Sequence, residues 1–322
     1  MSNRGNVVYF WTFYIKLFAF SVFVFDIVQR FYNLLLVGDR MKNNSLDIKY
    51  SLDMLRLEYK VKTSDLQRLL DSLQYRTDCD YWECTRYFSY RHQFTFRTDL
   101  NNSYTLLADF NGAKKTDNKI VILEFNPNKV GKDLGLLSLL GKIYSMSYKG
   151  RIVRFDCAID IPVSRDRCFL MKDQRTYSEY KNSSSDYTQY LGHRNAHGFV
   201  KLYNKAKELK LPVDNLTRLE LTIDGDKTNQ FPLLFPKVYV LNNLQVDDGF
   251  LSLSDTDKVL VLACMDNPKY LDMLGRKKGK KIKEFIAVNS FIPSPDYACF
   301  SSVCSLASGY LHCSLDIIDK YL

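Results

Sequence analysis

Three segments in the second half of the chain alternate between apolar and polar residues, and this pattern limits the folds that the chain can adopt. They are RIVRFDCAIDI at 151–161, GFVKLYNK at 198–205 and LTRLELTI at 216–223. Successive side chains of a β-strand point to opposite faces, so each segment predicts a strand with one apolar and one polar face. A sheet of such strands has its apolar face covered by other elements and its polar face left open.

The first half of the chain supplies further strands and the helices that would cover the apolar face. Strands are predicted at 53–61, 104–110 and 119–125, and amphipathic helices at 64–74 and 133–148. Ser64 and Gln67 have the spacing of a capping box, which predicts that they hold the start of the first helix. We therefore predict an α+β fold, with a largely antiparallel sheet, helices on one face and an α-rich C-terminal region.

Composition divides the chain into three parts. Residues 7–25 are almost wholly apolar, so residues 1–40 are either a membrane-associated extension or, as we favour, an upstream segment ahead of a natural start at Met41. Residues 41–232 contain the predicted sheet. Residues 233–322 are α-rich and include the basic run GRKKGKKIK, which predicts either a nucleic-acid contact or a solvated charged helix.

Charge and cysteine content narrow the class of protein. The net charge of +9 and the pI of about 9.0 favour a partner that is nucleic acid or an anionic membrane surface. The eight Cys form no CxxC pair, which favours buried, reduced thiols and a cytoplasmic location. The sequence has no GxxxxGK[ST] phosphate-binding loop, so strand separation by ATP hydrolysis would have to come from a partner.

If the three alternating strands are neighbours, their polar faces bring a reactive set of side chains together. The set consists of Asp156, Asp160, Glu220, Tyr203, Lys201, Lys205, Arg154 and Arg218. Three carboxylates suit Mg²⁺ or Mn²⁺, and such an ion polarises a phosphoryl oxygen while Lys and Arg neutralise developing charge. Cations beside Tyr203 are expected to lower its pKa. Taken singly, each residue is more often an ordinary surface group, so the prediction depends on the agreement of three strands.

The segments RFDCAID, YLGHRNAHGFVKLYNKAKELK and LTRLELTI, in this order and spacing, resemble the motifs of the replication initiation factor family (Rep_trans). The family comprises initiators of staphylococcal-type rolling-circle plasmids and related relaxases, and the resemblance covers roughly residues 50–225. It implies the following site: Tyr203 as nucleophile, Asp156, Asp160 and Glu220 at the divalent ion, and Lys205, Arg218 and Arg194 as basic residues. Lys201 and Ala196 stand where the family often has Arg and Ser.

The resemblance implies a DNA nicking-closing enzyme. Residues 41–232 would cut one strand at an origin through a covalent 5′-phosphotyrosine, and residues 233–322 would recognise the origin. The expected partners are origin DNA in duplex and single-stranded form, a host helicase and polymerase, and a second copy of the chain. Two alternatives stay open, a conjugative relaxase of the same family and a non-catalytic, sequence-specific DNA-binding protein.

Overall fold

The computed structural model describes residues 47–74, 76–98, 102–111, 117–181, 187–212, 215–241, 252–266, 270–288, 290–291 and 295–322. They belong to one compact unit, Asp47–Leu322. The other unit, Met1–Leu46, lies outside the described residues, and so do both predictions for residues 1–40. Within the described ranges, no helix is both long and apolar enough to cross a membrane.

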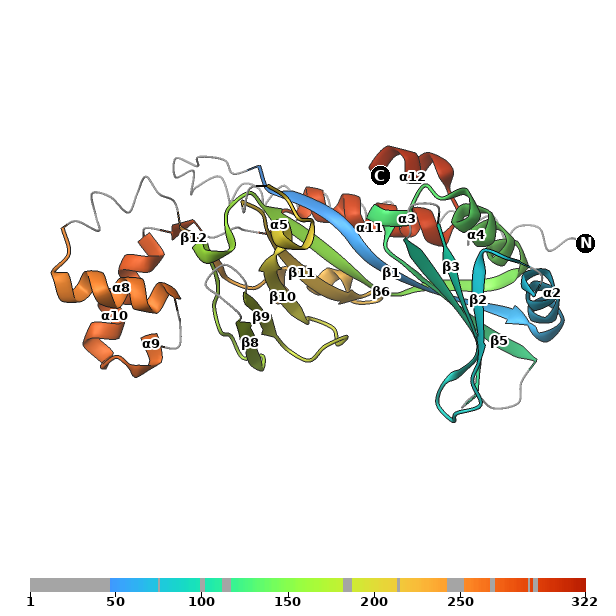
Figure 1. The fold of residues 1–322 in the computed structure, drawn as a ribbon, viewed down its shortest axis with the longest axis horizontal. Coiled ribbons are helices and arrows are strands. Elements are labelled where there is room, and N and C mark those ends of the chain that lie inside the picture. The colour runs from blue at the N-terminus through green and yellow to red at the C-terminus, as the bar shows by residue number, and fades with distance from the viewer. Residues whose placement is uncertain are drawn as a thin grey trace, which may run out of the picture. The chain divides into compact units, whose positions relative to one another are not determined.

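A ten-stranded antiparallel sheet forms the centre of the unit, in the order β2-β3-β4-β5-β1-β6-β11-β10-β9-β8 (Figure 1). Its strands are β1 Lys49–Lys62, β2 Cys79–Glu83, β3 Tyr90–Arg97, β4 Ser103–Phe110, β5 Asn118–Phe125, β6 Ser147–Ile161, β8 Tyr177–Lys181, β9 Tyr187–Leu191, β10 Val200–Asn204 and β11 Thr217–Asp224. A small sheet joins β7 Cys168–Leu170, β12 Val238–Leu241 and β13 Ser290–Phe291. The predicted antiparallel α+β fold is confirmed.

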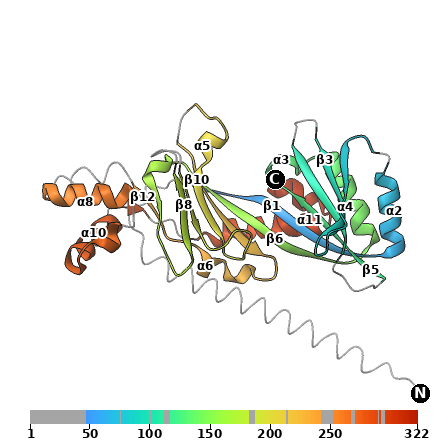
Figure 2. The same ribbon diagram turned by 60° about the horizontal axis from the view of Figure 1, so that its bottom comes forward.

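Helices α2 Thr63–Leu73, α3 Pro127–Val130, α4 Leu134–Met146 and α11 Tyr297–Leu311 pack on the central strands of the large sheet. The other helices are α5 Lys205–Glu208, α6 Phe231–Leu234, α8 Asp255–Asp266, α9 Tyr270–Met273, α10 Arg276–Val288 and α12 Leu315–Tyr321. Helix α11 lies along β1 and β6 (Figure 2), where Phe300 stacks on Phe155 with ring centres 6.2 Å apart. The Tyr59 hydroxyl donates to the Leu311 carbonyl at 3.0 Å. The C-terminal helix α11 thus packs on the sheet, and α12 packs on α11.

The start of α2 differs from the capping-box prediction. The helix begins at Thr63 without a side-chain cap, and Gln67 donates to Asp71 at 2.8 Å rather than back to the helix start. The Thr63 backbone N–H and hydroxyl both donate to the Asp117 carbonyl, at 2.9 and 3.0 Å. Strand β1 runs directly into α2, so a tertiary contact replaces the local cap.

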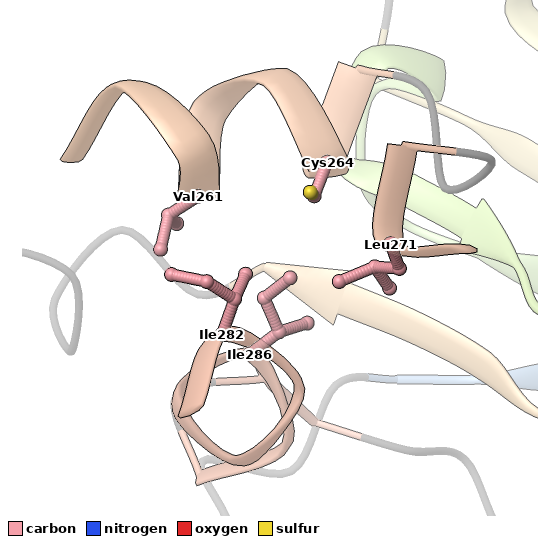
Figure 3. Packing of buried hydrophobic residues seen from close by; sticks show 5 residues of the cluster. All are labelled: Val261, Cys264, Leu271, Ile282 and Ile286. Carbon is pink, nitrogen blue, oxygen red and sulfur yellow. The ribbon is translucent and has the colours of Figure 1, made fainter. Parts of the chain in front are cut away.

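Helices α8, α9 and α10 share a small apolar cluster of their own. Figure 3 shows its members pointing toward one another: Val261, Cys264, Leu271, Ile282 and Ile286. The basic run predicted from the sequence lies largely in α10. Two of its cations, Lys278 and Lys281, form ion pairs with the buried Asp257 of α8, Lys281 at 2.7 Å. Part of the basic run therefore stabilises the helix packing.

Candidate active site

The three alternating strands are neighbours in the sheet, which is the condition on which the predicted site depended. Strand β11 pairs with β10 on one side and with β6 on the other. The register places Tyr203 opposite Arg218, and Arg218 opposite Asp160. Val200 and Leu202 are fully buried on the apolar face. The alternation therefore places Tyr203 and the charged side chains on the polar face.

Tyr203 and Glu220 form a close hydrogen-bonded pair. The phenol donates to Glu220 Oε1 at 2.6 Å, and Tyr203 is only 6% exposed. The Lys201 ammonium lies 3.8 Å from the centre of the Tyr203 ring and 3.6 Å from Glu220 Oε2. Lys205 follows the end of β10, yet its Nζ is still 3.4 Å from the Tyr203 hydroxyl. A second carboxylate, Glu208, also interacts with the phenol, and it forms an ion pair with Lys205 at 3.0 Å. The phenol thus faces two carboxylates and two cations.

The pKa values of this pair are set by burial and by negative neighbours. Burial, followed by the charge and hydrogen bond of Glu220, raises the pKa of Tyr203 well above its usual range, and Arg218 offsets this only in part. Burial also raises the pKa of Glu220, while Lys201 lowers it. A cation does lower the pKa of Tyr203, as expected, but burial and the adjacent carboxylate outweigh it, so the net shift is upward. The phenol stays protonated at neutral pH beside a ready proton acceptor.

Arg218 binds two carboxylates from neighbouring strands. Its Nε and Nη2 donate to Asp160 at 2.6 and 2.7 Å, and Nη1 donates to Asp53 Oδ1 at 3.0 Å. The sequence reasoning missed Asp53. It lies at an irregularity of the β1–β6 pairing between Leu52 and Met54, so strict alternation does not predict where its side chain points. Arg218 is therefore a cross-link between strands.

The three predicted metal ligands lie on one face with separate partners. Asp160 binds Arg218, Glu220 accepts from Tyr203, and Asp156 accepts from Thr222 Oγ1 at 2.7 Å. Over the described part of the chain, no three His, Cys, Asp or Glu side chains are gathered closely enough to hold an ion. The donor chemistry nevertheless suits a hard cation. The charges of Asp53 and Asp156 raise the pKa of Glu220 in addition to burial, so added positive charge is favourable here.

Arg194 is the predicted site residue that the structure does not bring to Tyr203. It is exposed in the loop between β9 and β10, and it forms no hydrogen bond or ion pair with the other described residues. The next residue, Asn195, has a φ of 65° and accepts a hydrogen bond from Arg154 at 3.4 Å. This bond ties the loop to β6 of the site face.

Comparisons with known proteins agree with the motif resemblance. One curated "Replication initiation protein" from Staphylococcus aureus is 24% identical over 182 residues, which cover 54% of this chain and 56% of the relative. A second, from the same species, is 23% identical over 188 residues, covering 56% of this chain and 58% of the relative. The chain thus matches little more than half the length of these relatives.

The chain was also compared with solved structures and with protein family models. A solved rolling circle replication initiator protein from Geobacillus stearothermophilus has 15% sequence identity and a TM-score of 0.37, over 57% of this chain and 78% of that one. No protein family model matches the chain. The similarity to replication initiation proteins is confirmed by the two curated relatives.

Proposed function

We propose that the chain is a rolling-circle replication initiator that nicks and rejoins one DNA strand at an origin through Tyr203. The observation that carries this proposal is the 2.6 Å hydrogen bond from the Tyr203 hydroxyl to Glu220, with Lys201 and Lys205 beside the same phenol. The similarity to replication initiation proteins supports the choice of DNA as substrate.

In the proposed reaction Glu220 is the general base. The Tyr203 oxygen forms a bond to the phosphorus while its proton passes to Glu220, and the bond from phosphorus to the 3′ oxygen breaks. The leaving 3′ oxygen takes a proton from solvent. Lys201 and Lys205 neutralise charge on the non-bridging oxygens. The covalent phosphotyrosine conserves the energy of the phosphodiester for rejoining.

Arg218 has a positioning role in this scheme. All three of its bonds go to Asp160 and Asp53, so it fixes β11 and the register of Glu220 rather than meeting the phosphate. Mg²⁺ or Mn²⁺ would be held by Asp156, Asp160 and Glu220, and it would polarise a phosphoryl oxygen of the substrate.

Duplex recognition at the origin is assigned to α8–α10. Arg276, Lys277 and Lys283 of α10 are exposed, and backbone phosphates are the groups that such cations bind. The chain is further expected to act in the cytoplasm as a homodimer that recruits a host helicase and polymerase.

Covalent capture tests the reaction. Labelled single-stranded oligonucleotides that tile the DNA around the gene are incubated with the full chain and Mg²⁺ or Mn²⁺, and adducts are separated on a denaturing gel. The expected result is an adduct with the wild type and none with Tyr203→Phe. Tyr190→Phe is the matched control, because Tyr190 faces Lys201 across the β9–β10 register. If the wild type forms no adduct, the alternative of a non-catalytic DNA-binding protein is favoured. If Tyr203→Phe still forms an adduct, the nucleophile is a residue other than Tyr203.

A further inference from the structure

The hairpin of β2 and β3 holds three large aromatic rings in solvent. Trp82 is 68% exposed, Tyr87 70% and Phe88 74%. Single exposed rings are common on protein surfaces, whereas a group of them marks an interaction surface. The hairpin includes β2, the strand at the end of the large sheet, and none of the three rings belongs to the site around Tyr203.

Hydrogen bonds from Asn111 hold the turn that carries the exposed side chains of Tyr87 and Phe88. Asn111 Nδ2 donates to the carbonyls of Cys84 and Arg86, at 2.8 and 3.1 Å, and the Asn111 backbone N–H donates to Ser89 at 2.8 Å. Phe88 has a φ of 62°, a conformation that a bulky residue rarely adopts. Strain of this kind persists where the surrounding structure enforces it, and it clusters at functional sites.

Contacts within the hairpin explain the position of the neighbouring ring, Tyr81, but not that of Trp82. Tyr81 is also exposed, but it packs on Phe94 with ring centres 4.8 Å apart, and its hydroxyl bonds His92 Nδ1 at 2.9 Å. Trp82 points to the other face of β2, opposite Gln93, and among the described residues its side chain has no ring contact or hydrogen bond. The fold therefore accounts for Tyr81 and leaves Trp82 available to a ligand.

The charge and composition of the hairpin indicate the ligand. The hairpin from Cys79 to Arg97 contains three Arg and one His together with two carboxylates, Asp80 and Glu83. Arg97 pairs with Asp80, and Arg91 lies 3.7 Å from Asp109, so among the described residues Arg86 of the turn is the guanidinium of the hairpin without an ion pair. Residues 81–98 contain no Leu, Ile, Val or Met, the aliphatic residues that fill a protein-binding core. Rings interleaved with guanidinium groups match unpaired nucleic acid, in which bases stack on aromatic faces and phosphates bind cations.

We propose that Trp82, Tyr87 and Phe88 form a stacking site for the bases of single-stranded DNA, with Arg86 at the adjoining phosphates. The proposal rests on the proposed function, because nicking and unwinding at the replication origin would release the single strand. Binding itself does not involve Tyr203, so the two can fail separately.

The fluorescence of Trp82 provides a direct measurement. The chain has two Trp, so Trp11→Phe leaves Trp82 as the only indole of the full-length protein. Titration with an oligothymidine of about 12 nucleotides, within the site sizes of such proteins, is expected to quench its emission to saturation. Tyr203→Phe is expected to give the same quenching curve, because the stacking site lies outside the nicking chemistry.

Variants assign the binding to the rings. Anisotropy of labelled oligothymidine is expected to show at least about fivefold weaker binding for Trp82→Ala and for Phe88→Asn, since stacking changes affinity about fivefold to a hundredfold per base. Asn tolerates the positive φ of position 88, so the turn is kept. Arg86→Gln should reduce the slope of log K against log salt by about 0.7. Tyr148→Ala, an exposed ring of β6, is the matched control and should bind like the wild type.

Two results would overturn the proposal. The first is unchanged Trp82 emission together with wild-type affinity in Trp82→Ala and Phe88→Asn. The second is a change of oligomeric state in those variants, seen by light scattering, without a change in DNA affinity, which would make the hairpin a contact between copies. Quenching without any covalent adduct would refute the nicking reaction and keep the stacking site.

Discussion

The substitution Glu220→Gln tests whether the proton of Tyr203 passes to Glu220. Glutamine keeps an oxygen that can accept from the phenol, but it removes the negative charge and the base. At the observed 2.6 Å, a phenolate beside an ionised carboxylate repels it by about 6 kcal/mol, taking an effective dielectric constant of about 20. Transfer of the proton to Glu220 avoids this repulsion, because only one of the two groups is then charged.

Loss of the base should therefore slow covalent capture by about 10²- to 10⁴-fold. The assay is the single-turnover rate of adduct formation at saturating DNA and metal, followed across pH. The wild-type rate should rise as the pH passes through the raised pKa of Glu220, which gives the pH profile an acid limb. This acid limb should be absent from the profile of Glu220→Gln. Asp224→Asn, at the end of the same strand, is the matched control and should keep both rate and limb.

Two outcomes would refute this reasoning. A Glu220→Gln rate within about threefold of the wild type would show that general-base transfer, which contributes far more, does not occur. A faster rate would show that the phenolate forms unaided, since removal of the carboxylate lowers the pKa of Tyr203 while Lys201 and Lys205 remain. Recovery at high Mn²⁺ would show that Glu220 contributes through metal binding alone and not as the base.

Three further substitutions test the framework around the site. Arg165→Met removes a fully buried guanidinium that donates to Gln189 and to three backbone carbonyls, so the free energy of unfolding in urea should fall by about 3 kcal/mol. Arg218→Lys cannot bind Asp160 and Asp53 together, and it should lower both urea stability, by about 1–3 kcal/mol, and the adduct rate. Lys278 lowers the pKa of Asp257 in the folded protein. The ion pair therefore stabilises the fold above the unfolded-state pKa of about 4, and this stabilisation is lost as the pH falls through the lower folded-state pKa. Asp257→Asn should flatten that acid dependence of the melting temperature.

The sequence predicted the features that depend on alternation along one strand. Because the period of a strand is two, burying Leu202 requires Tyr203 to lie on the polar face, and a slip by one residue would reverse both. Features that depend on departures from the period were missed. Asp53 reaches Arg218 from an irregular pairing, and Phe88 owes its exposure to a turn with positive φ. The sequence showed the cations that lower the pKa of Tyr203, but not the burial and the nearby carboxylate that raise it further, so the net upward shift was missed.

The position of Lys201 links substrate binding to the strength of the base. In the free protein its ammonium covers the Tyr203 ring and lies 3.6 Å from Glu220, where it lowers the pKa that burial raises. A phosphate at the phenol competes for the same cation. In the proposed reaction, binding of the phosphate moves Lys201 away from the Tyr203 ring and from Glu220. The pKa of Glu220 therefore rises at the step in which Glu220 accepts the proton of Tyr203.

This argument predicts different effects of Lys201→Gln on two pH profiles. The profile of kcat/KM reports the free enzyme, and its acid limb should move to higher pH because Glu220 loses the cation that lowers its pKa. The limb of the rate at saturating DNA should stay in place, since the phosphate has already taken Lys201 in the complex. An equal shift in both profiles would mean that Lys201 remains on Glu220 throughout, and that the phosphate is neutralised by Lys205.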